Sequence, residues 1–187
     1  MSDRVIKAAL LGLGTVGTGV YKVLKSQEEE MSAKVGCKVE ITRILVRNIE
    51  KAGAKVKDPS VLTNSWESIL EDPEIEIVIE LIGGINPARE YILQALNAGK
   101  HVVTANKDLI AVHGHELLDA AHAKKVDFLF EAAVAGGIPI IRPLKQCLAG
   151  NHMTEVMGIV NGTTNFILTK MSQEGMEFKD ALALATE

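Results

Sequence analysis

The chain has 187 residues, of which 47% are apolar and 24% are charged, and its formal net charge is −4 at pH 7. A chain of this length can bury a sizeable core, as one domain or as one domain plus part of another. The acidic balance, with Lys and Arg scattered along the chain, argues against a nucleic-acid partner.

Cysteine content and the length of the apolar runs give expectations about location. Cys37 and Cys147 lie far apart and outside any CxxC motif, which fits a reducing compartment better than a disulfide scaffold. No apolar stretch approaches the roughly 20 residues that span a bilayer. We therefore expect a cytoplasmic protein without a membrane partner.

Short apolar runs alternate with helical patterns as far as Phe130, which is typical of βαβ units around a parallel sheet. The runs that we predict as strands are 5–11, 39–46, 75–82, 101–104 and 126–130. Helices are predicted from apolar spacing and end signals at 16–24, 65–70, 87–98 and 109–124. The sequence thus predicts a Rossmann-type, doubly wound α/β fold.

The regular alternation ends after Glu131. The segment AAVAGGIPIIRPL has two glycines and two prolines close together, and we place a domain boundary there, between residues 136 and 137. Beyond it we predict a helix through 148, a strand at 155–160, a polar loop at 161–165, and helices at 166–171 and from 178 to 187. Because no stop signal follows the last helix, we expect 137–187 to be the beginning of an α+β second domain.

A glycine-rich turn, GxGxxG, follows the first predicted strand and opens a helix. It consists of Gly12, Leu13, Gly14, Thr15, Val16 and Gly17. In dinucleotide-binding folds the first glycine permits a tight turn, the second lets the backbone approach the pyrophosphate, and the third lets helix and strand pack closely. We therefore predict cofactor binding at this turn and the helix N-terminus. The alternative is that the glycines merely close a tight βα turn.

The end of the second predicted strand bears on the choice between NADP and NAD. A carboxylate usually stands there to hold the ribose 2′-OH, but this strand ends in Val46-Arg47-Asn48. The Arg47 guanidinium could instead pair with a 2′-phosphate, with Lys51 or Lys55 as additional partners. We therefore favour NADP over NAD; the alternative for Arg47 is a solvated loop residue.

Residues just after the next strands are candidates for chemistry, because ligands of doubly wound sheets collect beyond the carboxyl ends of the strands. Gly83 and Gly84 suit a close approach by the cofactor's ribose or nicotinamide. Lys107 could hold a substrate carboxylate or carbonyl oxygen, or transfer a proton. The alternative is a surface lysine at a helix start, although a helix N-terminus disfavours lysine.

Glu131 is a candidate cation ligand, because its carboxylate and nearby backbone carbonyls could together ligate a hard cation. A helix-capping glutamate fits the spacing equally well. The five histidines lack the spacing of a metal site. Cys147 is expected to be a small buried hydrophobe rather than a nucleophile.

Four blocks taken together resemble homoserine dehydrogenases closely over essentially the whole chain. They are LGLGTVGTGV, TANK, EAAVAGGIPIIRPL and GIVNGTTNFILTKM, in the order seen in that family, and the last is the most distinctive. The resemblance implies an NAD(P)-dependent, reversible conversion of L-homoserine and L-aspartate 4-semialdehyde, on the route to threonine and methionine.

The resemblance also assigns roles to individual residues. The run 13–16 matches the family's phosphate-binding turn. Thr104 and Lys107 match positions on the nicotinamide and substrate side, where Lys107 looks like the family's active-site lysine. The residues that match a monovalent cation site, expected to hold sodium, are Glu131 and, through their backbone carbonyls, Val134, Gly136 and Ile138.

Family members continue with acidic residues that bind substrate, a further lysine credited with proton donation, and a sheet that mediates dimerisation. We therefore expect these 187 residues to bind the cofactor with little or no activity alone. The complete enzyme is expected to be a homodimer that acts on a small molecule. Two alternatives stay open: a different NAD(P)-dependent alcohol dehydrogenase, against which the NGTTNFILTKM block argues, and a non-enzymatic NADP-binding or sensing module.

Overall fold

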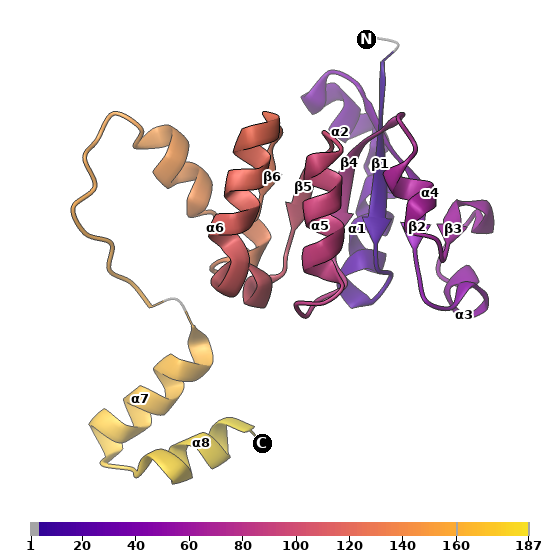
Figure 1. The fold of residues 1–187 in the computed structure, drawn as a ribbon. Coiled ribbons are helices and arrows are strands. Elements are labelled where there is room, and N and C mark those ends of the chain that lie inside the picture. Colours follow the sequence, from indigo (N-terminus) through magenta and orange to yellow (C-terminus); the bar gives the residue numbers. More distant parts are fainter. Residues whose placement is uncertain (1–3, 160, 187) are drawn as a thin grey trace. The chain divides into compact units, whose positions relative to one another are not determined.

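The computed structural model describes residues 4–159 and 161–186, and within them six parallel strands form one sheet in the order β3-β2-β1-β4-β5-β6. The strands are β1 (Val5–Leu11), β2 (Lys38–Leu45), β3 (Leu62–Thr63), β4 (Ile75–Glu80), β5 (His101–Thr104) and β6 (Phe128–Leu129). The strand order reverses at β1, which pairs with β2 on one side and with β4 on the other (Figure 1). This is the switch point of a doubly wound sheet, so the predicted Rossmann-type α/β class is confirmed.

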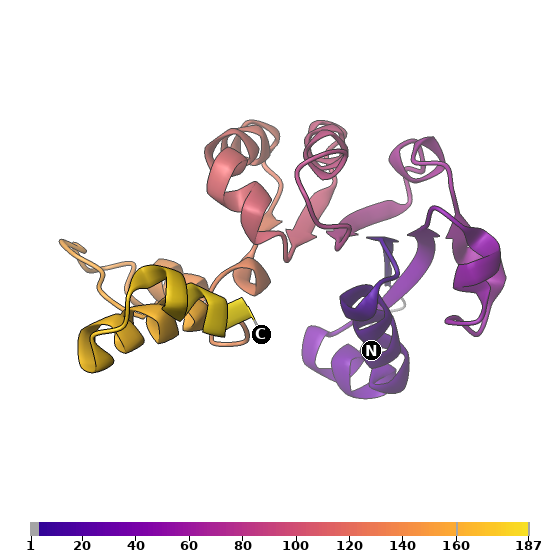
Figure 2. The same cartoon turned by 90° about the horizontal axis from the view of Figure 1, so that it is seen from below.

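Helices cover both faces of the sheet. They are α1 (Thr15–Ser26), α2 (Glu28–Val35), α3 (Ile49–Gly53), α4 (Glu67–Leu70), α5 (Ala88–Asn97) and α6 (Lys107–Lys124), with 3₁₀ turns at η1 (Pro59–Val61) and η2 (Glu131–Ala133). Figure 2 shows α5 and α6 on one face and α1 and α2 on the other. Side chains of β1 alternate between the two faces, as a pleated strand requires. Ala8 and Leu10 belong to the core cluster on the α1 face, whereas Ala9 and Leu11 pack in the cluster that contains Ile92 of α5.

Most predicted elements of this part are present. The strands predicted at 5–11 and 101–104 have those bounds, and the helix predicted at 87–98 is α5, one residue shorter at each end. By contrast, α6 begins before the predicted 109, and β6 keeps two residues of the predicted 126–130. Sequence reasoning missed α2, although glutamates fill its first turn and Gly36, at φ +84°, ends it.

Contacts divide the described chain into two compact units, one ending at Ala133 and one beginning at Val134. This division falls three residues before the expected boundary at 136/137, in the same glycine- and proline-rich segment. The second unit contains a π-helical turn (Pro143–Cys147), α7 (Gly162–Glu174) and α8 (Phe178–Thr186). Glu187, to which the last helix was predicted to extend, lies outside the described residues.

Three predictions for the second unit are wrong. Residues 155–159 form no strand, because no described strand pairs with them and an unpaired strand leaves its backbone hydrogen bonds unmade. Val160, the last residue of that predicted strand, lies outside the described residues. Residues 162–165 start α7 rather than forming a loop, because the Asn161 side chain accepts the Thr164 N–H at 2.7 Å and caps the helix. Cys147 is exposed, not buried, because it ends a short π-helix that has no buried residue.

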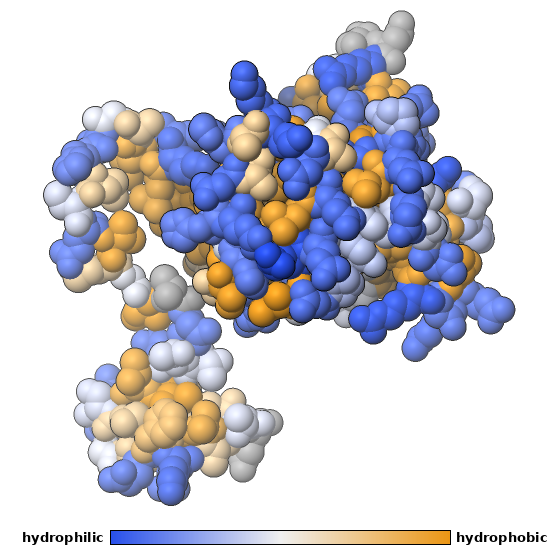
Figure 3. All heavy atoms as spheres, viewed as in Figure 1, coloured by the Kyte–Doolittle hydropathy of each residue, from blue (hydrophilic) through white to orange (hydrophobic). Residues whose placement is uncertain are grey.

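Apolar side chains lie on the surface of α7 and α8, as Figure 3 shows. Leu168, Leu182 and Leu184 are among the exposed ones. Apolar side chains that gather on a surface mark a contact surface in many proteins. Within residues 4–159 and 161–186, no helix is long and apolar enough to cross a bilayer.

Candidate functional site

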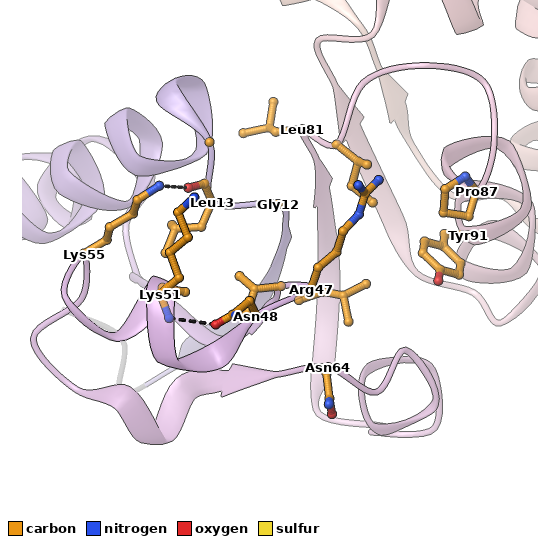
Figure 4. A pocket seen from close by; sticks show the side chains of 15 residues that line it. Gly12, Leu13, Arg47, Asn48, Lys51, Lys55, Asn64, Leu81, Pro87 and Tyr91 are labelled. Carbon is orange, nitrogen blue, oxygen red and sulfur yellow. Dashed lines mark hydrogen bonds between the residues drawn. The ribbon is translucent and has the colours of Figure 1, made fainter.

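A cavity of about 760 Å³ lies in the first unit, where β1, β2 and β4 end. Its walls come from the glycine turn after β1, the residues after β2, α3, the loop after β4 and the start of α5 (Figure 4). In doubly wound sheets, ligands bind at the carboxyl ends of the strands beside the switch point. The cavity therefore lies where the sequence predicted a dinucleotide.

The glycine turn is tightly packed on one side and open on the other. Gly12 has φ +96°, and a Cβ atom there would lie 2.9 Å from a backbone carbonyl oxygen of the loop after β4. A Cβ atom on Gly17 would lie 2.2 Å from the Gly12 carbonyl oxygen. Gly14, which precedes α1, has open space at its Cβ position, and the next residues Thr15 and Val16 are exposed. A phosphate can therefore approach the backbone at Gly14 and at the N-terminus of α1.

Three cations line the cavity, and no carboxylate is among the described residues of its wall. They are Arg47, Lys51 and Lys55. Arg47 is exposed, and its side chain extends across the cavity in Figure 4. The Lys55 ammonium donates a hydrogen bond to the Leu13 carbonyl oxygen at 2.8 Å, which ties the segment after α3 to the glycine turn. The cavity is thus electropositive, and its cations match the charge of phosphate groups.

An apolar wall made by Pro87 and Tyr91 lies on the other side of the cavity (Figure 4). The Tyr91 ring stacks on Trp66, with ring centroids 4.6 Å apart. Trp66 is buried, and its indole N–H donates to the side-chain oxygen of Gln94, so the stacked pair is held in place. Sequence reasoning missed this wall. The available signal was the four-residue spacing of Pro87 and Tyr91, which puts both on one face of a predicted helix.

A buried polar cluster joins the carboxyl ends of β4 and β5. Glu80 is fully buried, and its carboxylate accepts the Thr104 hydroxyl at 2.6 Å. The same carboxylate accepts the backbone N–H groups of Ile82 at 2.7 Å and of Gly83 at 3.2 Å. Through Glu80 the structure therefore links Gly83, after β4, to Thr104, the last residue of β5. Sequence reasoning did not assign a role to Glu80, although a glutamate within an apolar strand was a signal.

Lys107 is the first residue of α6 and is exposed. Asn106 caps the helix, because its side-chain oxygen accepts the Leu109 N–H at 3.2 Å. The Asn106 amide nitrogen donates to the carbonyl oxygen of Gly84 at 2.6 Å. Lys107 therefore lies, like Gly83 and Gly84, at the carboxyl ends of the strands. The sequence predicted this location for all three residues.

The four expected cation ligands belong to different units. Glu131 begins η2 in the first unit, whereas Val134, Gly136 and Ile138 are in the second. In the described part of the chain, no group of three or more His, Cys, Asp or Glu residues could hold a metal ion. A site built from one carboxylate and several backbone carbonyls is a different kind of ligand set. The cation site therefore stays a prediction.

Comparisons with known proteins match nearly all of the chain to one family. Residues 12–131 match the model described as the NAD binding domain of homoserine dehydrogenase, and residues 139–187 match the model described as homoserine dehydrogenase. The homoserine dehydrogenase of Bacillus subtilis is 46% identical over 184 residues, which make up 98% of this chain and 42% of that protein. The chain therefore spans about two-fifths of the length of this relative.

Solved structures agree with the sequence matches. A homoserine dehydrogenase from Thiobacillus denitrificans has a TM-score of 0.83 and 49% identity, over 97% of this chain and 42% of that one. A hyperthermophilic archaeal homoserine dehydrogenase in complex with NADPH has a TM-score of 0.77 and 28% identity, over 97% of this chain and 60% of that one. Family models, relatives and solved structures agree, and the chain belongs to the homoserine dehydrogenase family.

Proposed function

We propose that this chain is the cofactor-binding part of a homoserine dehydrogenase that prefers NADP to NAD. The observation that carries the preference is Arg47 in a cavity wall that holds no described carboxylate. A carboxylate usually holds the ribose 2′-OH of NAD, whereas cations pair with the 2′-phosphate of NADP. The NADPH complex of the archaeal relative supports the same choice.

Different residues of the cavity are proposed to hold different parts of the cofactor. The open backbone at Gly14 and the N-terminus of α1 suit the pyrophosphate. Arg47 is proposed to hold the 2′-phosphate, and Tyr91 to pack against the adenine. Gly83, Gly84 and Thr104 belong to the nicotinamide end in this proposal. When bound, the cofactor supplies the ring that accepts or gives a hydride.

The proposed reaction converts L-homoserine and L-aspartate 4-semialdehyde into each other. In the forward direction the alcohol carbon of homoserine loses a hydride to NADP⁺ and its hydroxyl loses a proton, which leaves the aldehyde, NADPH and a free proton. Lys107 is proposed as the residue of this chain that holds the substrate, through its carboxylate or its reacting oxygen. Because the chain spans 42% of the B. subtilis relative, we assign the remaining substrate contacts and the proton transfer to residues outside 1–187.

A monovalent cation, sodium by family resemblance, is a further part of the proposal. The ligands would be the Glu131 carboxylate and the backbone carbonyls of Val134, Gly136 and Ile138. All of these donors are oxygens, which are the atoms that hard cations prefer. The proposed role is structural, at the join between a cofactor domain (1–136) and the start of a substrate and dimerisation domain (137–187).

A homodimer is proposed for the complete enzyme. The apolar side chains exposed on α7 and α8, Leu168 and Leu184 among them, support it, because a contact surface would cover them. Sedimentation of the complete enzyme measures its mass directly. A dimer is expected, and a monomer at all concentrations contradicts this part of the proposal.

An enzyme of the family's full length that carries residues 1–187 tests the proposed reaction. It should reduce NADP when L-homoserine is supplied, and Arg47→Ala should raise the KM for NADP about 10- to 100-fold. Failure to oxidise homoserine while oxidising another alcohol would overturn the proposed substrate. Binding of NADP without oxidation of any alcohol would favour a non-enzymatic NADP-binding module.

A further inference from the structure

Glu80 carries a buried carboxylate whose two oxygens are both hydrogen-bonded. The residue is fully buried at the end of β4. Oε1 accepts the N–H groups of Ile82 and Gly83, and Oε2 accepts the hydroxyl of Thr104. A buried carboxylate is costly unless it is paired or hydrogen-bonded in this way. These bonds compensate the burial of Glu80 and connect it to two separate segments of the chain.

The hydrogen bonds continue from Glu80 into a closed ring. The Thr104 hydroxyl, which donates to Glu80, accepts the Asn106 N–H at 3.0 Å. The Asn106 side chain then donates to the Gly84 carbonyl oxygen at 2.6 Å. Gly84 adjoins Gly83, which returns to Glu80 through its N–H. Glu80, Gly83, Gly84, Asn106 and Thr104 thus brace two loops that are more than twenty positions apart in the sequence.

The ring joins the two loops that the proposed function uses at the reacting end of the cofactor. Gly83 and Gly84 have φ of +78° and +72°, and each has open space at its Cβ position, so conformation rather than crowding explains glycine there. Glu80, at the end of the strand that leads into this turn, is also held in place, since it pairs with Thr104 across β4 and β5. Lys107 follows the brace directly as the first residue of α6.

We infer that Glu80 and Asn106 are positioning residues that set the placement of Lys107 relative to the backbone of the Gly83–Gly84 turn. The inference rests on the proposed function, in which the turn faces the nicotinamide end and Lys107 holds the substrate. Hydride transfer requires the two reacting carbons in close, aligned contact, and a misplacement of about 1 Å can cost about 100-fold in rate. A rigid link between the two loops supplies that alignment.

The ring requires a carboxylate at position 80. If a glutamine oxygen there accepted the Ile82 N–H, the glutamine NH₂ would face the Thr104 hydroxyl, which already accepts the Asn106 N–H and needs an acceptor for its own proton. If the amide were turned over, its NH₂ would face two backbone N–H donors. In the first orientation the hydroxyl can accept the NH₂, but its own proton then loses the acceptor that Glu80 provides. In the second orientation the NH₂ opposes two donors, so Glu80→Gln weakens the brace with almost no change in shape.

Steady-state kinetics of the full-length enzyme with L-homoserine and NADP test the inference. Two variants break the ring at different points: Glu80→Gln, and Asn106→Ser, which keeps a helix-capping hydroxyl but cannot reach Gly84. Each is expected to lower kcat at least about 10-fold with the KM for NADP within about 3-fold, since the adenosine end is held elsewhere. Glu76→Gln is the matched control, because Glu76 lies on the same strand in an exposed ion pair with Arg4. Its kcat should stay within about 2-fold.

Repeating the ring substitutions in a Lys107→Ala variant distinguishes an effect through Lys107 from a general loss of structure. If the brace acts through Lys107, adding Glu80→Gln or Asn106→Ser should lower the residual kcat by less than about 3-fold. An unchanged kcat in the single variants, a KM for NADP that rises as much as kcat falls, or a full additional loss in the Lys107→Ala background would each overturn the inference.

If Glu80→Gln does not fold, the kinetics of Asn106→Ser alone decide the test. If the unsubstituted enzyme does not oxidise homoserine, the proposed function is refuted rather than this inference. Calorimetric titration of that enzyme with NADP then shows whether it binds the cofactor.

Discussion

Gly17 packs so closely on Gly12 that a Cβ atom on Gly17 would lie 2.2 Å from the Gly12 carbonyl oxygen. Real Cβ atoms essentially never come within 3.0 Å of such an atom, so the helix and the glycine turn could not both keep their places. Gly19, on the exposed side of the same helix, has no atom within 4 Å of its Cβ position. The two glycines should therefore respond in opposite ways to the same substitution.

Gly17→Ala is predicted to lower the free energy of unfolding by about 2 kcal/mol or more, because α1 must move away from the turn. The same movement displaces the phosphate-binding backbone, so NADP affinity should be lost. Gly19→Ala is the matched control and should raise stability by about 0.5–1 kcal/mol with affinity unchanged. Urea unfolding and calorimetry measure both effects. A Gly17→Ala chain that binds NADP as tightly as the original would contradict the proposed role of the turn.

Arg47→Ala is predicted to weaken NADP binding about 10- to 100-fold, since one or two charge-assisted hydrogen bonds to the 2′-phosphate are lost. NAD has no such phosphate, so its affinity should change by no more than about 2-fold. Lys57→Ala is a charge-matched control, because Lys57 is exposed nearby and does not line the cavity. Calorimetric titration with both cofactors gives the comparison. Equal losses for NADP and NAD would remove Arg47 from the specificity site.

Lys55→Met should act differently from Arg47→Ala. The Lys55 ammonium bonds the Leu13 carbonyl oxygen at 2.8 Å, so its loss loosens the turn that both cofactors share. We expect the affinities for NADP and for NAD to fall together, by about 5- to 10-fold, the size of one lost charge-assisted hydrogen bond. The same titrations measure it. A loss confined to NADP would show that Lys55 binds the 2′-phosphate instead of supporting the turn.

Local signals were sufficient to predict most of the strands and the glycine turn of the first unit, but not α2, α3 or β3. The strand at 5–11 and the turn from Gly12 to Gly17 could be identified because apolar runs and glycine spacing act over a few residues. The cations after β2 were also found, because their place follows from strand order. Glu80 and Tyr91 were not assigned roles, since their partners Thr104 and Trp66 are distant in sequence and meet them only in the folded protein.

The second unit shows where local signals fail. The apolar pattern at 155–160 predicted a strand, yet Met157 is 83% exposed and no described strand pairs with that segment. Strand formation depends on a neighbour that the pattern itself does not encode. The prediction of a loop at 161–165 was wrong for the opposite reason, because the signal was local. Asn161 caps α7 by accepting the Thr164 N–H. The polar composition of the segment was interpreted as a loop, although polar residues of this kind also cap helices.

An ion pair between α5 and α6 gives a prediction about acid stability. The Arg89 guanidinium donates to both carboxylate oxygens of Glu116, which holds the pKa of Glu116 below its ordinary 4.5. His113, with its Nδ1 3.4 Å from the same carboxylate, acts in the same direction. A lowered folded-state pKa means that the unfolded chain binds more protons. The stabilisation is therefore complete above pH 4.5 and is lost as the pH falls through the lowered pKa.

Arg89→Met should accordingly be less stable than the original chain at neutral pH, and the difference should shrink as the pH falls below about 4. Urea unfolding of both chains in steps from about pH 7 to about pH 3.5 measures the difference. Lys34→Met is a suitable control, since the Lys34–Glu30 pair lies within α2 and joins no two elements. A difference between the Arg89→Met and original chains that is constant over this range would show that Glu116 does not sense Arg89.

Calorimetric titration of residues 1–187 with NADPH and with NADH is the most direct test that this chain holds the cofactor of a homoserine dehydrogenase through an electropositive cavity. The account predicts one NADPH per chain and an NADH affinity at least about 10-fold weaker, because Arg47 has no phosphate to bind in NADH. Absence of binding by both cofactors, or tighter binding of NADH than of NADPH, would contradict it.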